Sequence, residues 1–256
     1  MKRILLITLS TFVLSSVFPQ QTFKTKNPKD SLTLSYRIGT DFSMSFGNVN
    51  SYNSLNEGYL EVDQRIIGFD ALARYRYGWL AGTQNASELQ TNLNIKIYPR
   101  YWVYAFAKGG VESSFMRATS LRGFVGGGAE FRPIDNEKHT FKPYIGYMFE
   151  HNDYREPILL ANDSAYTWTT HRGIVGWSGV HKFAKGRIIL THNFNWVHSF
   201  VNFKRYRFYG SIDILIPVWK MITIRTAFYG SYDNLVPIGF VSQDMLFTVG
   251  ILATNF

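Results

Sequence analysis

The chain contains no cysteine, and this absence excludes a disulfide framework, a thiolate metal site and a lipoprotein anchor. Charged residues are scarce, at 18% of the 256 residues, and no stretch shows the 3.6-residue apolar period of a helix. Aromatic residues are abundant instead, at 17%, with 21 Phe and 16 Tyr. A chain this aromatic is not disordered, and one this poor in Leu, Ala and Glu is not helical, so the composition favours an all-β protein.

The first residues have the pattern of a cleavable export signal. Lys2 and Arg3 precede an apolar run from Ile4 to about Phe18, which is shorter than the roughly 20 residues that a membrane-spanning helix needs. A membrane anchor helix is the alternative. We therefore expect a signal peptide over residues 1–20, with an approximate cleavage site, a periplasmic tail over 21–31 and one β domain over 32–256.

From residue 32 onward, apolar and polar residues alternate in series, as the stretch ELQTNLNIKIYPRYWVYAFAKGG at 88–110 illustrates. This period of two is typical of strands with one apolar and one polar face. The least regular segment is 52–63, where Glu57 and Glu61 oppose only Leu60 and Val62. We count about twelve strands, with ten as the alternative: 32–46, 52–63, 66–80, two within 88–110, 122–132, 141–151, 168–183, 187–198, 205–218, 222–231 and 246–256.

The connecting segments alternate in length. Short connections follow the even strands, at 64, 99–100, 135–136, 185–186 and 219–220, whereas longer ones follow most odd strands, at 81–87, 113–120, 152–166 and 233–243. This asymmetry is typical of an antiparallel up-and-down transmembrane β-barrel with both termini in the periplasm. A soluble sandwich or lipocalin-like barrel has the same period with its apolar face inward.

Three features favour the membrane barrel over the soluble one. Many strands reach 11 or more residues, about the length that a tilted membrane strand needs, and the last strand ends on Phe256. Aromatic residues also gather near the predicted strand ends, as interfacial girdles do. These residues are Tyr98, Tyr101, Trp102, Trp219 and Tyr232.

Several segments resemble the salt-induced outer-membrane protein family, whose function is largely uncharacterised. They are Phe46-Gly47-Asn48-Val49-Asn50, YWVYAFAKGGVESSF, LRGFVGGGAEFRP and YIGYMFEHNDY, and the similarity runs from about residue 33 to the end. The resemblance implies a twelve-stranded barrel in the outer membrane of a Gram-negative bacterium and supplies no catalytic residues. Phe256 looks like an insertion signal for the outer-membrane assembly machinery. The other expected partners are outer-membrane lipid and lipopolysaccharide, and we expect a monomer.

With the apolar faces toward lipid, the polar faces line a lumen rich in charge. Such charges are tolerated there only if they are paired or hydrated. A ladder of ion pairs that fills a narrow lumen is one interpretation, and a narrow, basic-lined channel that prefers small anions is the other. The predicted lumen residues are Arg37, Asp41, Asp70, Arg74, Arg76, Lys96, Lys108, Glu112, Arg122, Glu130, Arg132, Arg172, Arg205, Arg207, Asp213 and Arg225.

Other functions find little support in the sequence. The net charge is +9, but no basic helix or aromatic RNA-binding signature accompanies it, so nucleic acid is not an expected partner. The six histidines show no HExxH or other metal-ligand spacing, and we expect no metal and no cofactor. Two alternatives stay open: an enzyme of the phospholipase or protease barrel type, and a surface adhesin or receptor that uses the apolar loops at 152–167 and 233–243.

Overall fold

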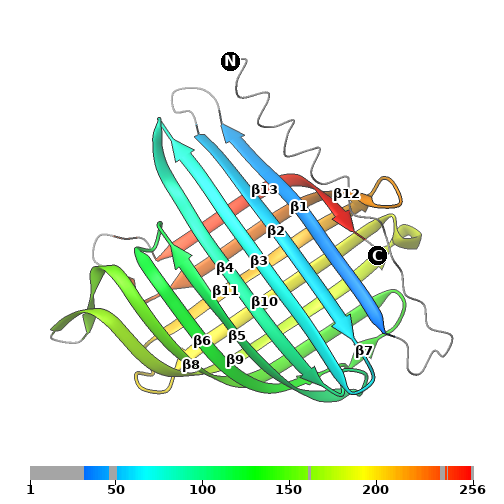
Figure 1. The fold of residues 1–256 in the computed structure, drawn as a ribbon, viewed down its shortest axis with the longest axis horizontal. Helices are drawn as coiled ribbons and strands as arrows, with labels where there is room; N and C mark the ends of the chain where they lie inside the picture. Colours follow the sequence, from blue (N-terminus) through cyan, green and yellow to red (C-terminus); the bar gives the residue numbers. More distant parts are fainter. Residues whose placement is uncertain (1–31, 46–50, 161–162, 237–239, 241, 255–256) are drawn as a thin grey trace.

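The chain folds as a closed antiparallel β-barrel of twelve long strands in the computed structural model, which describes residues 32–45, 51–160, 163–236, 240 and 242–254 (Figure 1). The strands are β1 (Thr33–Ser45), β2 (Ser51–Asp63), β3 (Ile67–Leu80), β4 (Thr83–Ile97), β5 (Val103–Ser114), β6 (Thr119–Phe131), β8 (His139–Leu160), β9 (Asp163–Phe183), β10 (Ile188–Ser199), β11 (Tyr206–Pro217), β12 (Ile222–Asp233) and β13 (Gln243–Thr254). The prediction of twelve strands is confirmed, and the alternative of ten is wrong.

Two strand pairings close the barrel. The first strand pairs with the last, from Arg37 opposite Thr254 to Phe42 opposite Val249, so β1 and β13 lie side by side (Figure 1). At the other junction β6 pairs directly with β8, and β7 (Ile134–Asp135) is only a two-residue ribbon in the turn between them. Each long strand therefore has a partner on both sides, although β1 and β13 pair over only six residues each.

The strand that the sequence defined least well, β2, has a regular register. It pairs with β1 from Thr33 opposite Asp63 to Ser45 opposite Ser51. Glu57 is 3% exposed, whereas Leu60, on the opposite parity, is 40% exposed. The acidic residues of β2 therefore face the interior together with Leu55, whereas Leu60 faces outward.

One predicted loop is mostly strand. Residues 152–166 were expected to form an irregular connection, but β8 and β9 extend to 22 and 21 residues and form one long hairpin. A register shift between Asp153 and Ile158 marks where this hairpin leaves the barrel wall. Its apolar residues become buried, as described below, and this packing stabilises a strand where the sequence suggests a loop.

The connections β2–β3, β4–β5, β6–β8, β9–β10 and β11–β12 lie at one end of the barrel, here called the turn end, and the others lie at the loop end. The prediction of a longer connection at 81–87 is wrong, because β3 and β4 are joined by the two-residue turn Ala81-Gly82, in which Gly82 has a φ of 85°. At the turn end β9 is joined to β10 by the 3₁₀ turn η1 (Ala184–Gly186), in which Gly186 has a φ of 85° that favours glycine. No helix in the described part of the chain is long and apolar enough to cross a membrane.

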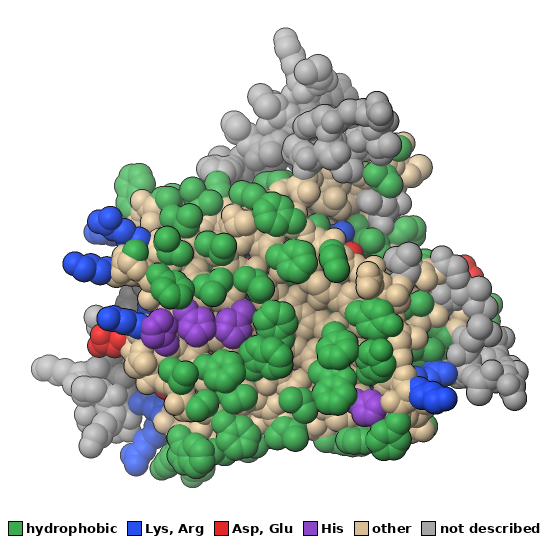
Figure 2. Space-filling model, turned by 180° about the vertical axis from the view of Figure 1, so that it is seen from behind, with side chains coloured by type: hydrophobic (Ala, Val, Ile, Leu, Met, Phe, Trp, Pro, Cys, Tyr) green, Lys and Arg blue, Asp and Glu red, His purple; other side chains and the backbone are tan. Residues whose placement is uncertain are grey.

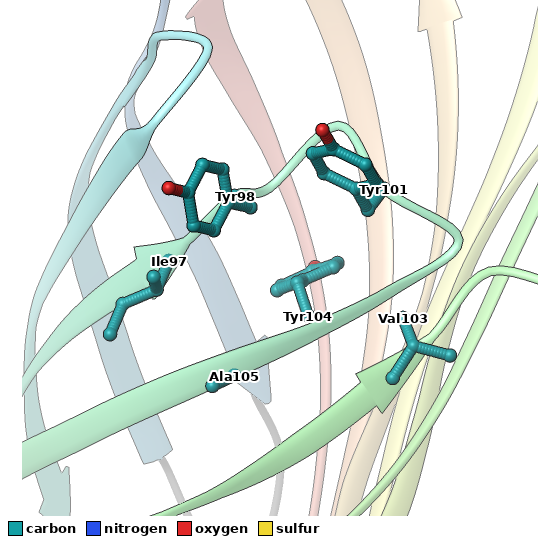
Figure 3. A pocket seen from close by; sticks show the side chains of 6 residues that line it. All are labelled: Ile97, Tyr98, Tyr101, Val103, Tyr104 and Ala105. Atoms are coloured by element: carbon teal, nitrogen blue, oxygen red, sulfur yellow. The ribbon is translucent and has the colours of Figure 1, made fainter.

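Apolar side chains cover the outer surface of the barrel (Figure 2). Aromatic residues mark its turn end, where Trp102 and Trp219 are 72% and 73% exposed. The rings of Tyr98 and Tyr101 meet edge to face with centroids 5.6 Å apart, above a shallow hollow between β4 and β5 (Figure 3). A band of exposed aliphatic residues with an aromatic rim is typical of a barrel surrounded by lipid.

The glycine-rich strand β6 lies unusually close to its neighbour. A Cβ added at Gly126 would come within 2.2 Å of the Tyr147 carbonyl oxygen, and one at Gly128 within 2.1 Å of the Ile145 oxygen. Only glycine permits this approach of β6 to β8. The run of three glycines therefore has a structural role at the junction where β6 meets β8.

The apolar band predicts a large difference between adjacent residues of one strand. Ile212 lies near the middle of β11 and is 38% exposed, whereas Ser211 lines the interior. Ile212→Arg should lower the free energy of unfolding in lipid vesicles by about 2–4 kcal/mol, because arginine would face the hydrocarbon. Ser211→Arg is the matched control and should cost much less. Urea titration of both refolded variants measures the difference, and equal losses would contradict a lipid-facing Ile212.

Candidate functional site: the barrel lumen

Glu57 is the centre of the first of two ion-pair networks inside the barrel. Its carboxylate contacts Arg37 at 2.5 Å, Arg74 at 2.7 Å and Arg225 at 3.2 Å. Arg225 also binds Asp41 through Nε, at 3.0 and 3.1 Å, and neither side chain is exposed. These residues come from β1, β2, β3 and β12, so the network joins strands on both sides of the β1–β13 closure.

Glu150 is the centre of the second network, nearer the loop end. It accepts hydrogen bonds from Arg172 at 3.1 Å and from Arg207 at 2.8 Å, and Arg122 lies 3.9 Å away. Arg122 also reaches Asp233 on β12 at 3.5 Å. Because β6 and β12 lie on opposite sides of the barrel, this contact crosses the lumen.

Two smaller clusters complete the paired charges. At the turn end the Lys96 ammonium contacts Glu61 at 2.6 Å, Asp70 at 2.7 Å and Asp63 at 3.8 Å, so three carboxylates share one cation. At the loop end Arg76 bridges Glu88 at 3.2 Å and Asp244 at 3.1 Å. Nearly every arginine of the lumen therefore has a carboxylate partner.

Part of the interior is apolar, which the sequence did not reveal. Met148, Ile174 and Val197 are at most 2% exposed and pack together across β8, β9 and β10. A second group, Ile189, Leu215 and Leu252, packs between β10, β11 and β13. These residues share the inward parity with charged neighbours, so hydropathy alone did not distinguish them from lipid-facing residues. They share the inward faces of β8 to β11 with the Glu150 network and with polar residues such as Asn195.

The lumen contains a cavity of about 930 Å³. Its lining begins at the turn end with Asn136 and Lys138 and reaches Arg117 and Asp244 at the loop end. The cavity therefore extends along most of the barrel. Arg117, in the connection after β5, donates to the Ser231 hydroxyl on β12 at 2.5 Å. This contact and the Arg122–Asp233 pair narrow the lumen near the loop end.

Lysines in the turn-end half of the cavity differ from the arginines. Among the described residues, Lys108, Lys138, Lys142 and Lys182 line the cavity without a carboxylate within ion-pair distance. The Lys108 ammonium lies instead 5.2 Å from the centre of the Tyr144 ring. Lys142 and Lys182 are on β8 and β9, across the barrel from the acidic cluster on β2 and β3. In the turn-end half of the cavity, lysines without a carboxylate partner therefore lie across the lumen from three carboxylates that share only Lys96.

The predicted lumen residues occupy three kinds of position. Fourteen of the sixteen lie inside the barrel, buried in the networks above or lining the cavity. The other two lie near its ends: Arg132 pairs with Asp135 in the turn after β6, and Arg205 precedes β11 and lies over Trp168. Both have the inward parity, but the strands end one residue before Arg132 and begin one residue after Arg205. Phe256, the predicted insertion signal, lies outside the described residues.

Several residues that complete the networks were not among the predicted lumen residues. Contacts to predicted lumen residues are made by Asp233, Glu88, Asp244 and Arg117. Asp233 and Asp244 lie at strand ends and Arg117 lies in a connection, where alternation no longer assigns a face, whereas Glu88 lies within β4. The inward parity of β12 and β13, extended to their loop ends, would have identified Asp233 and Asp244.

The two apolar loops pack against each other. Tyr154 and Ile158 of the β8–β9 hairpin bury their side chains against Leu235 in the connection after β12, and Trp168 covers them. Arg155 of the hairpin also donates its backbone N–H to Ala118, at 2.6 Å, in the connection after β5. Tyr154, Ile158 and Leu235 are therefore used in contacts within the chain at the loop end, whereas Tyr166 of the hairpin is exposed.

The described residues contain no group of three or more His, Cys, Asp or Glu side chains arranged to hold a metal ion. Glu150 is fully buried among Arg122, Arg172 and Arg207, whose charge it balances.

The Glu150 network predicts a large effect of a small substitution. Glu150→Gln keeps the size of the side chain but leaves Arg122, Arg172 and Arg207 close together without their shared anion. We expect a loss of about 3–5 kcal/mol in the free energy of unfolding, as for a broken buried ion pair. Glu88→Gln is the control and should cost about 1 kcal/mol or less, because Glu88 is partly exposed and Arg76 retains Asp244. Urea unfolding in lipid vesicles compares them, and similar losses would refute the central role of Glu150.

Solved structures of similar fold are bacterial outer-membrane barrels. The translocator domain of the autotransporter NalP from Neisseria meningitidis is 10% identical, covers 89% of each chain and has a TM-score of 0.48. The NanC porin is 9% identical over 88% of this chain and 99% of its own, with a TM-score of 0.47. The outer-membrane channel DcaP of Acinetobacter baumannii is 9% identical over 92% and 99%, with a TM-score of 0.39.

No curated protein matches the chain in sequence. One family profile does match, over residues 60–254, which span β3 to β13 and the last four residues of β2. This range includes the Glu150 network, the cavity lysines and every strand from β3 onward. The chain belongs to the family described as "Protein of unknown function, DUF481".

Proposed function

We propose that the protein is a monomeric outer-membrane barrel that forms a narrow channel for small hydrophilic solutes, with a modest preference for anions. The observation that carries this proposal is the cavity of about 930 Å³, whose lining reaches from the turn end to the loop end of the lumen. A barrel that serves only as a structural element needs no such space. The apolar outer band and its aromatic rim support placement in a lipid bilayer.

The lysines, and not the arginines, are the groups that we expect to attract anions. Arg74, Arg76 and Arg207 each contact at least one carboxylate, so little of their charge acts on a passing ion. Lys142 and Lys182 line the same cavity with no carboxylate in contact. Between low-dielectric walls such charges attract counter-ions strongly. The surplus carboxylates around Lys96 oppose them, and the preference should therefore be modest.

Electrical recording in planar bilayers tests this proposal. The folded protein should produce discrete conductance steps, and its reversal potential under a salt gradient should indicate anion preference. Lys142→Gln combined with Lys182→Gln should reduce that preference. Raising the salt from 0.1 M to 1 M should also reduce it, because the Debye length falls from about 10 Å to about 3 Å.

The matched control combines Lys204→Gln with Lys220→Gln, which remove the same charge from exposed connections outside the lumen. This variant should keep the selectivity of the unchanged chain. Absence of conductance from properly folded protein would refute the channel and favour a purely structural barrel. A cation-selective pore would show that the carboxylates around Lys96 dominate the field.

A further inference from the structure

Three histidines from three neighbouring strands meet on the outer surface near the turn end, where Figure 2 shows a row of histidine side chains among apolar ones. His139 opens β8 and lies directly opposite His181 of β9, and His192 of β10 lies diagonal to His181. These are the cross-strand positions whose side chains touch in a sheet. Their separation in the sequence hides this arrangement, because no two of them have a ligand spacing within one segment.

The ring nitrogens of these histidines face one another across two gaps. Nδ1 of His139 lies 3.2 Å from Nδ1 of His181, and Nε2 of His181 lies 3.0 Å from Nε2 of His192. The rings of His181 and His192 are stacked, with centroids 5.2 Å apart. We call this group the histidine row. His181 belongs to both gaps.

A glycine makes room for the second gap. His192 lies directly opposite Gly179, and a Cβ at Gly179 would come within 2.5 Å of His192 Nε2. The imidazole of His192 therefore lies over the backbone of β9, in the space that any other side chain would fill. This placement brings its Nε2 to His181. The contact between His181 and His192 therefore depends on the glycine at position 179.

The two gaps have the width of a metal-binding pair. Two imidazole nitrogens on one Zn²⁺, with bonds of about 2.0–2.1 Å, lie about 3.3 Å apart in a tetrahedral site and about 2.8 Å apart at a right angle. The observed 3.0 and 3.2 Å fall between these values. Because the ring centroids lie 5.2 and 5.4 Å apart, the nitrogens point almost directly at each other, so both rings of a pair must turn for their lone pairs to reach one ion. Imidazole suits Zn²⁺, Cu²⁺ and Ni²⁺, whereas Mg²⁺ and Ca²⁺ prefer oxygen ligands.

We propose that the histidine row binds one divalent transition-metal ion, with two imidazoles as protein ligands and water or another exogenous group at the remaining positions. His139 lies at Nδ1 of His181 and His192 lies at its Nε2, so the three rings do not converge on one point. This agrees with the absence of a three-residue metal cluster among the described residues. A neutral His181 has only one lone pair for a metal. Only one gap can therefore be occupied at a time.

Aromatic side chains flank the row. Phe183 and Phe194 pack beside it, with centroids 6.0 Å from His139 and 6.1 Å from His192. An imidazole binds a metal ion through the lone pair of a deprotonated ring nitrogen.

Copper and zinc titrations of the full chain, refolded in detergent without a polyhistidine tag, test the proposal. Calorimetry should give one ion per chain, and the electron paramagnetic resonance spectrum of bound Cu²⁺ should show nitrogen ligands. His181→Gln removes a ligand from both gaps and should weaken binding at least tenfold. His198→Gln is the control, because His198 lies on β10 beside Trp196, away from the row, and this variant should bind as the unchanged chain does.

Two further variants separate ligation from folding. Gly179→Ala keeps all three histidines but displaces His192, so it should weaken binding if the gap between His181 and His192 holds the metal. If His139→Gln is the variant that loses binding instead, the metal occupies the other gap. Heat-dependent gel mobility verifies that each variant is folded. Equal affinity in the unchanged chain and in folded His181→Gln would overturn the proposal and leave the row as a hydrogen-bonded stack.

Discussion

The need to neutralise charge inside a closed barrel is the constraint on which the rest of the structure depends. Alternation gives every strand one apolar and one polar face, and closure places all polar faces around one confined lumen. A buried charge without a partner costs several kcal/mol, so the arginines and carboxylates of different strands must meet. Glu57 and Glu150 each lie within ion-pair distance of three arginines and balance their charge.

These networks have a mechanical consequence as well as an electrostatic one. The Glu57 network ties strands on both sides of the β1–β13 closure, where the two ends of the chain must find each other. The Glu150 network reaches β12 through Asp233 and links opposite walls near the loop end. Guanidinium groups are suited to this role, because their planar fork binds several carboxylate oxygens at once.

The same constraint separates the roles of the two basic residue types. Arginines are concentrated in the paired networks, whereas several lysines of the turn-end half line open space. A flexible ammonium that faces water needs no fixed partner and remains available to a solute. The histidine row follows a different logic. It lies on the outer surface, outside the networks, and depends on strand register and on the space above Gly179.

The sequence by itself determined the strand number, the alternation of faces and the assignment of most charged residues to the interior, because each of these follows from a local period of two. Local pattern did not fix the lengths of the connections, since β3 and β4 are joined at the loop end by only two residues. Tertiary structure alone decided which charges pair, since Arg225 meets Asp41 and Glu57 only when the barrel closes. It also buried Leu215 and Met148 on the inward faces of their strands. The β8–β9 hairpin extends because it packs against Leu235. Strand register brought His139, His181 and His192 together. These contacts join residues far apart in the chain, and only strand register and curvature fix their distances.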